Sequence, residues 1–262
     1  MSDWRGSAGL YTVAYGEPAR KCARRLLASW RRFMPDVPVL LATDDPAAFF
    51  YTPHGIPTVT IIQPERPDIG ARDPKLRVYE LTPPEWAHVL YLDADCELLD
   101  SVEFLFEALA DGWEMVLTPN PGKYQSTRMM ARPNNRAEVE KTLELMGGDN
   151  GLQWNGGVFS FRRGETVARV FDLWLEGWRE ARNQDQPALH RALFTQPVRA
   201  LTVGSEWNAS TRYTDGRDNA IILHHQTEAR EMQGKLPIHT PGDSREAWAM
   251  LKREHKTRRS VV

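Results

Sequence analysis

The sequence has few cysteines and no long apolar run. Only two of its 262 residues are cysteines, Cys22 and Cys96, and they stand far apart in the chain. Two separated cysteines give no disulfide framework, which indicates a reducing compartment. No apolar stretch approaches the length of a membrane-spanning helix, and residues 1–9 lack the apolar core of a secretion signal. We therefore expect a soluble, cytoplasmic protein with no membrane span.

The sequence also lacks an excess of charge, internal repeats and low-complexity segments. Its 33 Lys and Arg against 35 Asp and Glu leave a formal charge of −2, which gives no electrostatic reason to expect a nucleic acid as partner. The tail 252–262 is basic, but a short basic tail is usually a solvated end. Because no convincing linker interrupts the chain, we predict a single domain over residues 1–262.

What the sequence does contain is a short apolar run followed by two aspartates. Residues 88–92 are too few for a helix and follow a pair of prolines, so they predict a buried strand. Asp93 and Asp95 come directly after it, and alternate residues of an extended chain share a face. Two carboxylates so close repel each other unless a cation lies between them or one is protonated. At the C-terminal end of a strand in an α/β sheet, where such folds bind ligands, they predict a Mg²⁺ or Mn²⁺ site that holds a diphosphate.

Two other interpretations of this Asp-Ala-Asp motif stay open. Aspartates are common in turns, so both could simply be solvated side chains at a strand end. Aspartate-nucleophile phosphatases also place two aspartates after an apolar strand, and the first of them attacks phosphorus. Those enzymes usually carry Thr or Val two residues after the motif, near the start of the chain. Here that position holds Glu97, a third of the way along, and both facts weigh against a phosphatase.

Strands and helices are predicted to alternate along the first part of the chain. Strands are expected at 10–14, 37–42 and 58–62, with helices at 19–33 and from a cap at 43–45 to about 51. This order is typical of a parallel nucleotide-binding sheet. Further along, the pattern predicts helices at 75–81, 104–110 (after a capping box at 100–103), 134–146, 165–182 and 245–255, and extended segments at 113–118, 158–161, 198–203, 207–208 and 220–223. We predict an α/β fold whose mixed, mostly parallel central sheet is flanked by helices.

Two features of the second half are candidates for ligand contact. Residues 119–133 form a long polar loop that carries three cationic side chains, at Lys123, Arg128 and Arg132, and it could be a lid or an ordinary surface connection. Two glycines, Gly156 and Gly157, enter the strand predicted at 158–161, which suggests a bulge or close approach by a ligand.

Two more polar residues begin or end predicted elements. Asp185 precedes a helix with Pro187 in its first turn, so helix capping alone would explain it. His224 and His225 end the last predicted strand, where a histidine pair is more often structural than metal-bound. Neither feature indicates a function by itself.

Taken in order, these features resemble the glycogenin-like, retaining nucleotide-sugar glycosyltransferases of the GT-A fold, which is Rossmann-like. The matching segments are 10–15, Lys75-Leu76, 91–95, 155–159, Asp185-Gln186 and 222–224. They are spread from about Leu10 to Gln226, over most of the chain. The resemblance implies a nucleotide-binding half at about 8–118 and a sugar and acceptor half at about 119–240.

The resemblance implies a role for each matching residue. Asp93, Asp95 and His224 would hold the metal ion, with His225 pointing away, and a set of carboxylates and imidazole favours Mn²⁺ over Mg²⁺. Three residues would act at the reaction centre: Lys75 by the leaving phosphate, Asp185 by a sugar hydroxyl near the reacting carbon, and Gln186 by the exposed face of the sugar. The other donor-binding residues would be Thr12, Val13, Ala14 and Tyr15 at the base and ribose, Ala94 in the motif, and Asn155, Gly156 and Gly157 facing the sugar.

We therefore expect a metal-dependent enzyme that moves a sugar from a nucleoside diphosphate, with UDP as first candidate, to an acceptor hydroxyl with retention. Retention needs no separate base if the leaving phosphate takes the acceptor's proton, and a covalent route through Asp185 stays open. The sequence departs from glycogenin in two places. No tyrosine matches its self-glucosylated one, and residues 16–18 differ from the family's usual base-binding loop. The acceptor and the oligomeric state are not identified.

Three alternative functions compete with this one. A nucleotidyltransferase on a similar fold would need a Gly-rich, basic loop after the first strand, which residues 15–20 lack. A catalytically silent nucleotide- or glycan-binding module would not need an intact metal motif. A transferase acting on modified DNA receives little support from the net charge, although the basic tail and the Lys123–Arg132 loop keep it open. Trp113, Trp154 and Trp207 could stack on sugar rings, although most tryptophans belong to the core.

Overall fold

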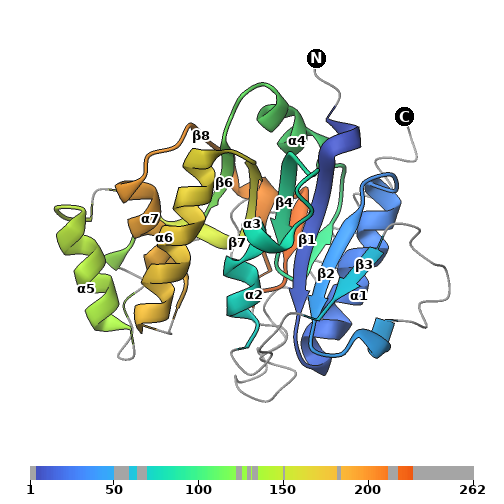
Figure 1. The fold of residues 1–262 in the computed structure, drawn as a ribbon, viewed down its shortest axis with the longest axis horizontal. Coiled ribbons are helices and arrows are strands. Elements are labelled where there is room, and N and C mark those ends of the chain that lie inside the picture. The colour runs from blue at the N-terminus through green and yellow to red at the C-terminus, as the bar shows by residue number, and fades with distance from the viewer. Residues whose placement is uncertain are drawn as a thin grey trace.

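A computed structural model describes residues 4–49, 59–63, 70–121, 126–128, 131, 135–149, 151–181, 184–211 and 218–226. Within these residues, a central sheet of seven strands is flanked by helices on both sides, and a second sheet has three short strands (Figure 1). The helix predicted at 245–255, the basic tail, Lys123 and Arg132 lie outside the described residues.

The central sheet has the strand order β3-β2-β1-β4-β7-β6-β8. The first four strands in this order are parallel neighbours, β7 is antiparallel to β4 and β6, and β8 is parallel to β6. The strands are β1 (Ala8–Ala14), β2 (Val39–Thr43), β3 (Val59–Ile62), β4 (His88–Leu92), β6 (Met115–Pro119), β7 (Trp154–Arg162) and β8 (Ala200–Thr202). The prediction of a mixed, mostly parallel sheet is confirmed.

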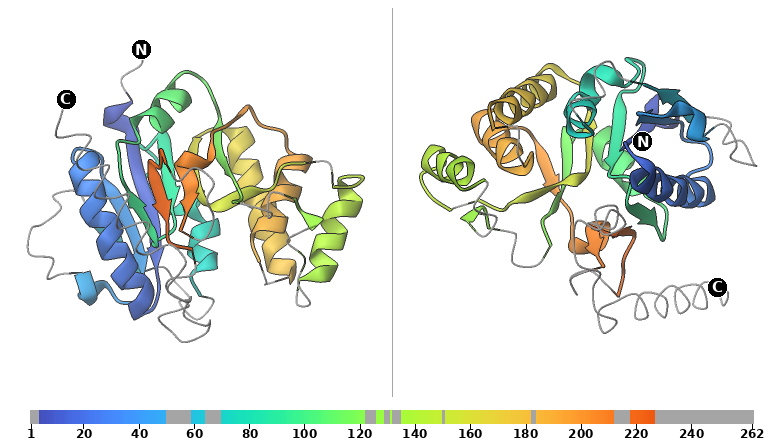
Figure 2. Two further views of the ribbon diagram at one scale, coloured as in Figure 1. Left: turned by 180° about the vertical axis from the view of Figure 1, so that it is seen from behind. Right: turned by 90° about the horizontal axis from the view of Figure 1, so that it is seen from below.

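Each face of this sheet is covered by its own set of helices. One face packs against α1 (Glu17–Phe33) and α4 (Glu103–Ala110). The other packs against α2 (Arg72–Leu76), α3 (Val78–Leu81), α6 (Glu165–Ala181) and α7 (Gln186–Thr195), and α5 (Arg136–Leu145) lies outside α7 (Figure 2). This layering explains why β1, β2 and β4 are almost entirely apolar, since both of their faces are buried.

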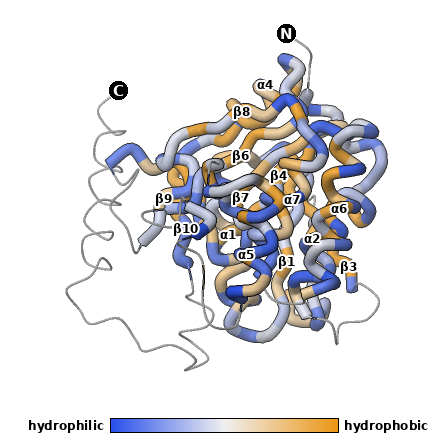
Figure 3. The backbone as a smooth tube through the Cα atoms, turned by 90° about the vertical axis from the view of Figure 1, so that its left-hand side faces the viewer, coloured by the Kyte–Doolittle hydropathy of each residue, from blue (hydrophilic) through white to orange (hydrophobic). Residues whose placement is uncertain are grey.

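Alternation along β1 divides the core into two layers. Leu10 and Ala14 pack with α1, while Tyr11 and Val13 pack on the opposite face. The central strands are correspondingly hydrophobic along their length (Figure 3). The prolines, glycines and aspartates that end the strands therefore lie at the edges of the sheet, where polar groups can gather.

The small sheet joins a segment just after β4 to the last described strand. Its order is β5 (Cys96–Leu98), β10 (Ile222–His224) and β9 (Ala209–Ser210), with β10 antiparallel to β5 and parallel to β9. This pairing carries the late histidine to the residues that follow the Asp-Ala-Asp motif. Long-range strand pairing, rather than sequence proximity, therefore builds that part of the molecule.

Three local predictions are wrong. Residues 207–208 are not extended but end a 3₁₀ helix, η6 (Ser205–Asn208), because Trp207 packs 5.5 Å from the ring of Phe104. The helix predicted at 75–81 is interrupted at Arg77, which separates α2 from α3. The capping box at 100–103 does not form, since Val102 occupies the N-cap position of α4.

The described residues also include two short 3₁₀ helices, η1 (Arg5–Ser7) and η2 (Pro46–Phe49). Among the described residues, no helix combines the length and apolar character needed to cross a membrane.

Candidate active site

The first aspartate of the motif is fixed where the chain leaves β4. The backbone N–H of Asp93 donates to the carbonyl of Gly157 on β7 over 2.8 Å. Tyr91 donates its phenolic hydrogen to Asp93 Oδ1 over 2.7 Å. Alternate residues of a strand share a face, which is why these two side chains meet. The carboxylate of Asp93 is thus oriented by its own strand and by the neighbouring one.

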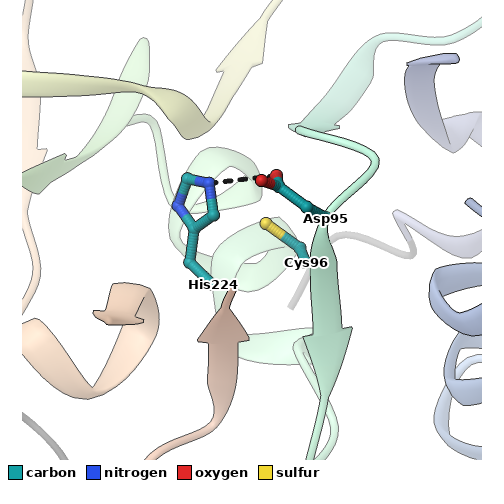
Figure 4. A group of neighbouring side chains, drawn as sticks. All are labelled: Asp95, Cys96 and His224. Atoms are coloured by element: carbon teal, nitrogen blue, oxygen red, sulfur yellow. Dashed lines mark ion pairs between the residues drawn. The ribbon is translucent and has the colours of Figure 1, made fainter. Parts of the chain in front are cut away.

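The late histidine reaches both aspartates of the motif. His224 Nε2 lies 3.2 Å from Asp95 Oδ1 and 3.9 Å from Asp93 Oδ2. Figure 4 shows the imidazole facing Asp95 from the end of β10. His225 instead places its Nε2 3.1 Å from Glu97 Oε2. The structure brings together the three residues predicted to hold a metal ion, and their binding of an ion stays a prediction.

Burial and proximity determine the charges of this trio. Burial alone would lower the pKa of His224, but the carboxylates of Asp95 and Asp93 outweigh it and raise that pKa. Burial would likewise raise the pKa of Asp95, yet the neighbouring imidazole of His224 lowers it. A proton on the imidazole therefore offsets the carboxylate charge. A divalent cation would perform the same task more strongly.

Gly157 leaves the space in which the trio converges. A Cβ atom at this position would lie 2.4 Å from Asp93 Oδ2 and 2.7 Å from His224 Cε1, closer than real Cβ atoms come. Two carboxylates and an imidazole are ligand types that Mn²⁺ accepts. The residues present therefore fit a divalent ion of that class.

A thiol lies beside the same cluster. Ligand atoms of Asp95, Cys96 and His224 all lie within 4.8 Å of one another (Figure 4), since Cys96 and His224 are direct partners across β5 and β10. Burial raises the pKa of the Cys96 thiol well above its ordinary value, and the nearby aspartates add to the effect. Because the thiolate is the metal-binding form, and because Cys96 packs within the apolar core, Asp93, Asp95 and His224 are the better candidate set.

A buried ion pair lies next to the trio. Lys75 Nζ is 2.7 Å from Asp185 Oδ2 and 3.6 Å from Asp93 Oδ1, and Arg72 Nε approaches Asp185 Oδ1 to 3.5 Å. Burial opposes both charges, but the attraction outweighs it, so the pKa of Lys75 is raised and that of Asp185 is lowered. The Asp185 side chain makes no capping hydrogen bond to α7. Simple capping, the plain interpretation of its sequence position, is therefore wrong.

An amide cluster includes Gln186, the residue after Asp185. Asn120 Oδ1 accepts hydrogen bonds from Asn155 Nδ2 (2.9 Å) and Gln186 Nε2 (2.7 Å). Asn155 Oδ1 in turn accepts the backbone N–H of Gly157 over 2.7 Å. The predicted sugar-side residues are thus linked through Asn120, which the sequence analysis did not single out.

The four residues predicted at the base and ribose end β1 and begin the loop after it. The side chains of Thr12, Val13 and Ala14 are buried, and only Tyr15 is partly exposed. Any contact of the first three with a ligand would therefore involve the backbone. Gly16 follows with a positive φ of 79°, which glycine adopts without strain, and donates its N–H to the carboxylate of Asp44 (3.0 and 3.1 Å).

Comparison with known proteins identifies the fold. No protein-family model matches the sequence, and no curated protein matches it either. The structure is similar to the apo crystal structure of mouse xyloside xylosyltransferase 1, with a TM-score of 0.57 and 12% sequence identity. The match covers 85% of this chain and 98% of the mouse chain. The fold is the GT-A fold of glycosyltransferases.

Three further residues at the site carry little or no sequence signal that could have identified them; one of them, Asn208, places its Oδ1 2.8 Å from His224 Nδ1. Tyr91, Asn120 and Asn208 are a phenol and two amides whose partners are mostly distant in the chain, and their residue types are common in turns and cores. Only Tyr91 was within reach of the sequence, because it lies two positions before Asp93 on a predicted strand.

Proposed function

We propose that this chain is a metal-dependent glycosyltransferase that moves a sugar from a nucleoside diphosphate, UDP in the first instance, to an acceptor hydroxyl with retention of configuration. The observation that carries the proposal is the convergence of two carboxylates, an imidazole and a buried Lys–Asp pair on a GT-A fold. They gather beyond the C-terminal end of β4, which lies on the opposite side of β1 from β2, so the strand order reverses between β1 and β4. Open α/β sheets bind ligands at such a position.

The metal centre is assigned to Asp93, Asp95 and His224, with Mn²⁺ preferred and Mg²⁺ as the alternative. When bound, the ion would supply Lewis-acid stabilisation of the charge that develops on the diphosphate. The raised pKa of His224 supports this assignment, because it records how strongly the two carboxylates attract positive charge at this point.

Lys75 supplies a second positive charge beside the metal centre. Its ammonium group lies between Asp185 and Asp93, and its raised pKa keeps it protonated at neutral pH. A phosphate oxygen of the donor would compete with these carboxylates for the ammonium hydrogens. We assign Lys75 to the leaving phosphate on this basis.

Asp185 is assigned to the sugar near its reacting carbon. Glycosyl transfer passes through a transition state with positive charge on the ring, as in glycoside hydrolysis, and an ionised carboxylate stabilises that charge. The lowered pKa of Asp185 keeps it ionised. Its pairing with Lys75 and Arg72 weakens it as a nucleophile, which favours a route in which the leaving phosphate accepts the acceptor's proton.

The remaining assignments follow the amide cluster and the end of β1. Gln186 and Asn155, both bound to Asn120, would contact sugar hydroxyls, and Gly156 and Gly157 would face the sugar. Residues 12–15 would lie against the base and ribose, and Ala94 beside the diphosphate. The closer likeness to glycogenin and a cytoplasmic location are retained as parts of the proposal from the sequence. The name of the mouse neighbour adds a xylosyl donor to those worth testing.

The test is a panel of nucleoside diphosphates and nucleotide sugars, with UDP-glucose and UDP-xylose included, measured with and without Mn²⁺. A ligand that binds the native state raises the melting temperature, so the preferred base and sugar should give the largest Mn²⁺-dependent shift. Hydrolysis of the best donor is then followed in the parent and in Asp93→Ala and Asp95→Ala. Full turnover in either variant would refute the proposal, and so would the absence of any Mn²⁺-dependent shift across the panel.

A further inference from the structure

The imidazole of His224 is held from behind by an amide. His224 Nδ1 lies 2.8 Å from Asn208 Oδ1, and its Nε2 faces the carboxylates of Asp95 and Asp93. An amide oxygen only accepts hydrogen bonds, so the hydrogen between these two atoms belongs to Nδ1. The lone pair of the neutral ring is then on Nε2, the atom that faces the two aspartates.

The orientation of the Asn208 amide is itself determined. Its Nδ2 donates to the carbonyl of Pro119 over 3.3 Å. Rotating the amide by half a turn would place its oxygen against that carbonyl and its NH₂ group against His224 Nδ1. The carbonyl of Pro119 therefore selects the observed orientation. Pro119 ends β6 at a shift in register against β7, so this carbonyl comes from an irregular part of the sheet.

The backbone and the neighbouring residues also hold Asn208 in place. Asn208 and His224 are both buried, at 1% and 4% exposure. Asn208 ends η6, and the residue before it, Trp207, packs against Phe104. The next strand, β9, pairs with β10, the strand that carries His224. The amide and the imidazole are thus attached to neighbouring backbone segments that fix their separation.

We propose that Asn208 is a positioning residue of the metal centre: it fixes which ring nitrogen of His224 faces Asp93 and Asp95 and holds the ring in the orientation for binding a divalent ion. This inference rests on the metal site of the proposed function, and adds a residue that does not contact the ion. Partners of this kind change metal affinity by about 10- to 100-fold when removed.

The experiment compares three variants with the parent in direct Mn²⁺ titration, without nucleotide or sugar. Asn208→Ala should weaken Mn²⁺ binding by about 10- to 100-fold, because the ring loses its acceptor. Asn208→Asp keeps an acceptor for Nδ1–H and should restore most of that affinity. Ser210→Ala is the matched control: it removes a hydrogen bond to Gln226 (3.1 Å) two residues further along and should leave Mn²⁺ affinity unchanged. Thermal unfolding of each variant shows whether it is folded.

A second measurement addresses the ring directly. Nitrogen-15 spectra of the metal-free protein, recorded at a pH above the titration of His224, should show hydrogen on Nδ1 in the parent and in Asn208→Asp. In Asn208→Ala the hydrogen should be shared between both ring nitrogens. The same spectra of Ser210→Ala should match the parent.

The outcomes separate this inference from the proposed function. If the parent and folded Asn208→Ala bind Mn²⁺ equally tightly, the positioning role is overturned and the metal site is left intact. Hydrogen on Nε2 in the parent would also overturn it. Parent protein that shows the expected ring state but no Mn²⁺ binding would refute the metal site, and with it this role.

Discussion

Lys75 Nζ lies 2.7 Å from Asp185 Oδ2, and both side chains are almost fully buried. The pair joins α2 to the start of α7, two segments that are far apart in the chain. Each charge has left water and depends on the other, because an unpaired buried charge is far more costly than a paired one. The pair therefore has a structural consequence that can be measured without knowing the substrate.

Lys75→Met should lower the free energy of unfolding by about 3–5 kcal/mol, since it leaves the Asp185 carboxylate buried with only the more distant Arg72. Asp185→Leu should have a similar effect on Lys75. The double variant should be less destabilised than the sum of the two, because it removes both charges. Denaturant unfolding of the four proteins measures the coupling. Strictly additive losses would show that the two groups do not stabilise each other.

Local sequence patterns predicted most of the architecture. Burial on both faces makes the inner strands apolar along their length, and burial of one face gives the helices apolar residues at helical spacing. The run at 88–92 and the helix at 19–33 are examples, and both form near the predicted positions. Residues 207–208 show the limit. Their local pattern fits a strand, but the packing of Trp207 on Phe104 turns them into η6. That contact joins segments that no local pattern relates.

The residues of the candidate site likewise fall into those that the sequence could identify and those that it could not. Charged residues such as Asp93 and His224 stand out in the sequence because their types are rare beside apolar strands. Asn120 and Asn208 do not, since their roles consist of hydrogen bonds to residues far away in the chain. Asp185 was found, but its contact with Lys75 required the tertiary structure.

The two adjacent histidines should respond differently to substitution. His224 faces the aspartates, whereas His225 faces Glu97. His224→Ala should therefore abolish the rise in melting temperature that Mn²⁺ produces in the parent, while His225→Ala should retain it. The measurement is a Mn²⁺ concentration series by thermal shift for all three proteins. Retention of the shift in His224→Ala together with its loss in His225→Ala would reverse the ligand assignment.

Acid should weaken the fold partly through a different histidine, His190 on α7. Burial lowers the pKa of His190 to about 4 from an ordinary value of 6.5, although Asp149 opposes the shift. The unfolded chain therefore takes up a proton between these two values while the folded chain does not. Above pH 6.5 the neutral state of His190 costs the fold nothing. As the pH falls towards 4, the free energy of unfolding declines by up to about 3 kcal/mol on account of this residue.

His190→Gln removes the titrating imidazole. The difference between the variant and the parent therefore measures the contribution of His190 separately from that of the carboxylates. His190 Nδ1 contacts Gln153 Oε1 at 2.9 Å, and an amide can donate to the same oxygen. Free energies of unfolding measured across this pH interval should fall more steeply in the parent than in the variant. Parallel curves would mean that His190 does not contribute to acid sensitivity.

The two neighbouring glycines of β7 offer a test of the metal centre by added volume alone. In Gly157→Ala the new methyl group would meet Asp93 Oδ2 at 2.4 Å and His224 Cε1 at 2.7 Å, so both side chains must move apart. In Gly156→Ala the nearest atoms, Asp185 Oδ2 and Lys75 Nζ, lie at 3.2 and 3.4 Å, which small adjustments can accommodate. Both substitutions add one methyl group to the same strand, so their difference reports on position and not on strand propensity.

We expect Gly157→Ala to lose Mn²⁺ affinity by at least about 10-fold, on the scale observed when the support of a metal ligand is disturbed, while Gly156→Ala stays within a few-fold of the parent. Direct Mn²⁺ titration measures both, and circular dichroism confirms that each variant is folded. Overpacking of this size costs about 1–3 kcal/mol, which a domain of ordinary stability tolerates. Equal Mn²⁺ affinity in folded Gly157→Ala and in the parent would show that the ion binds away from Asp93 and His224.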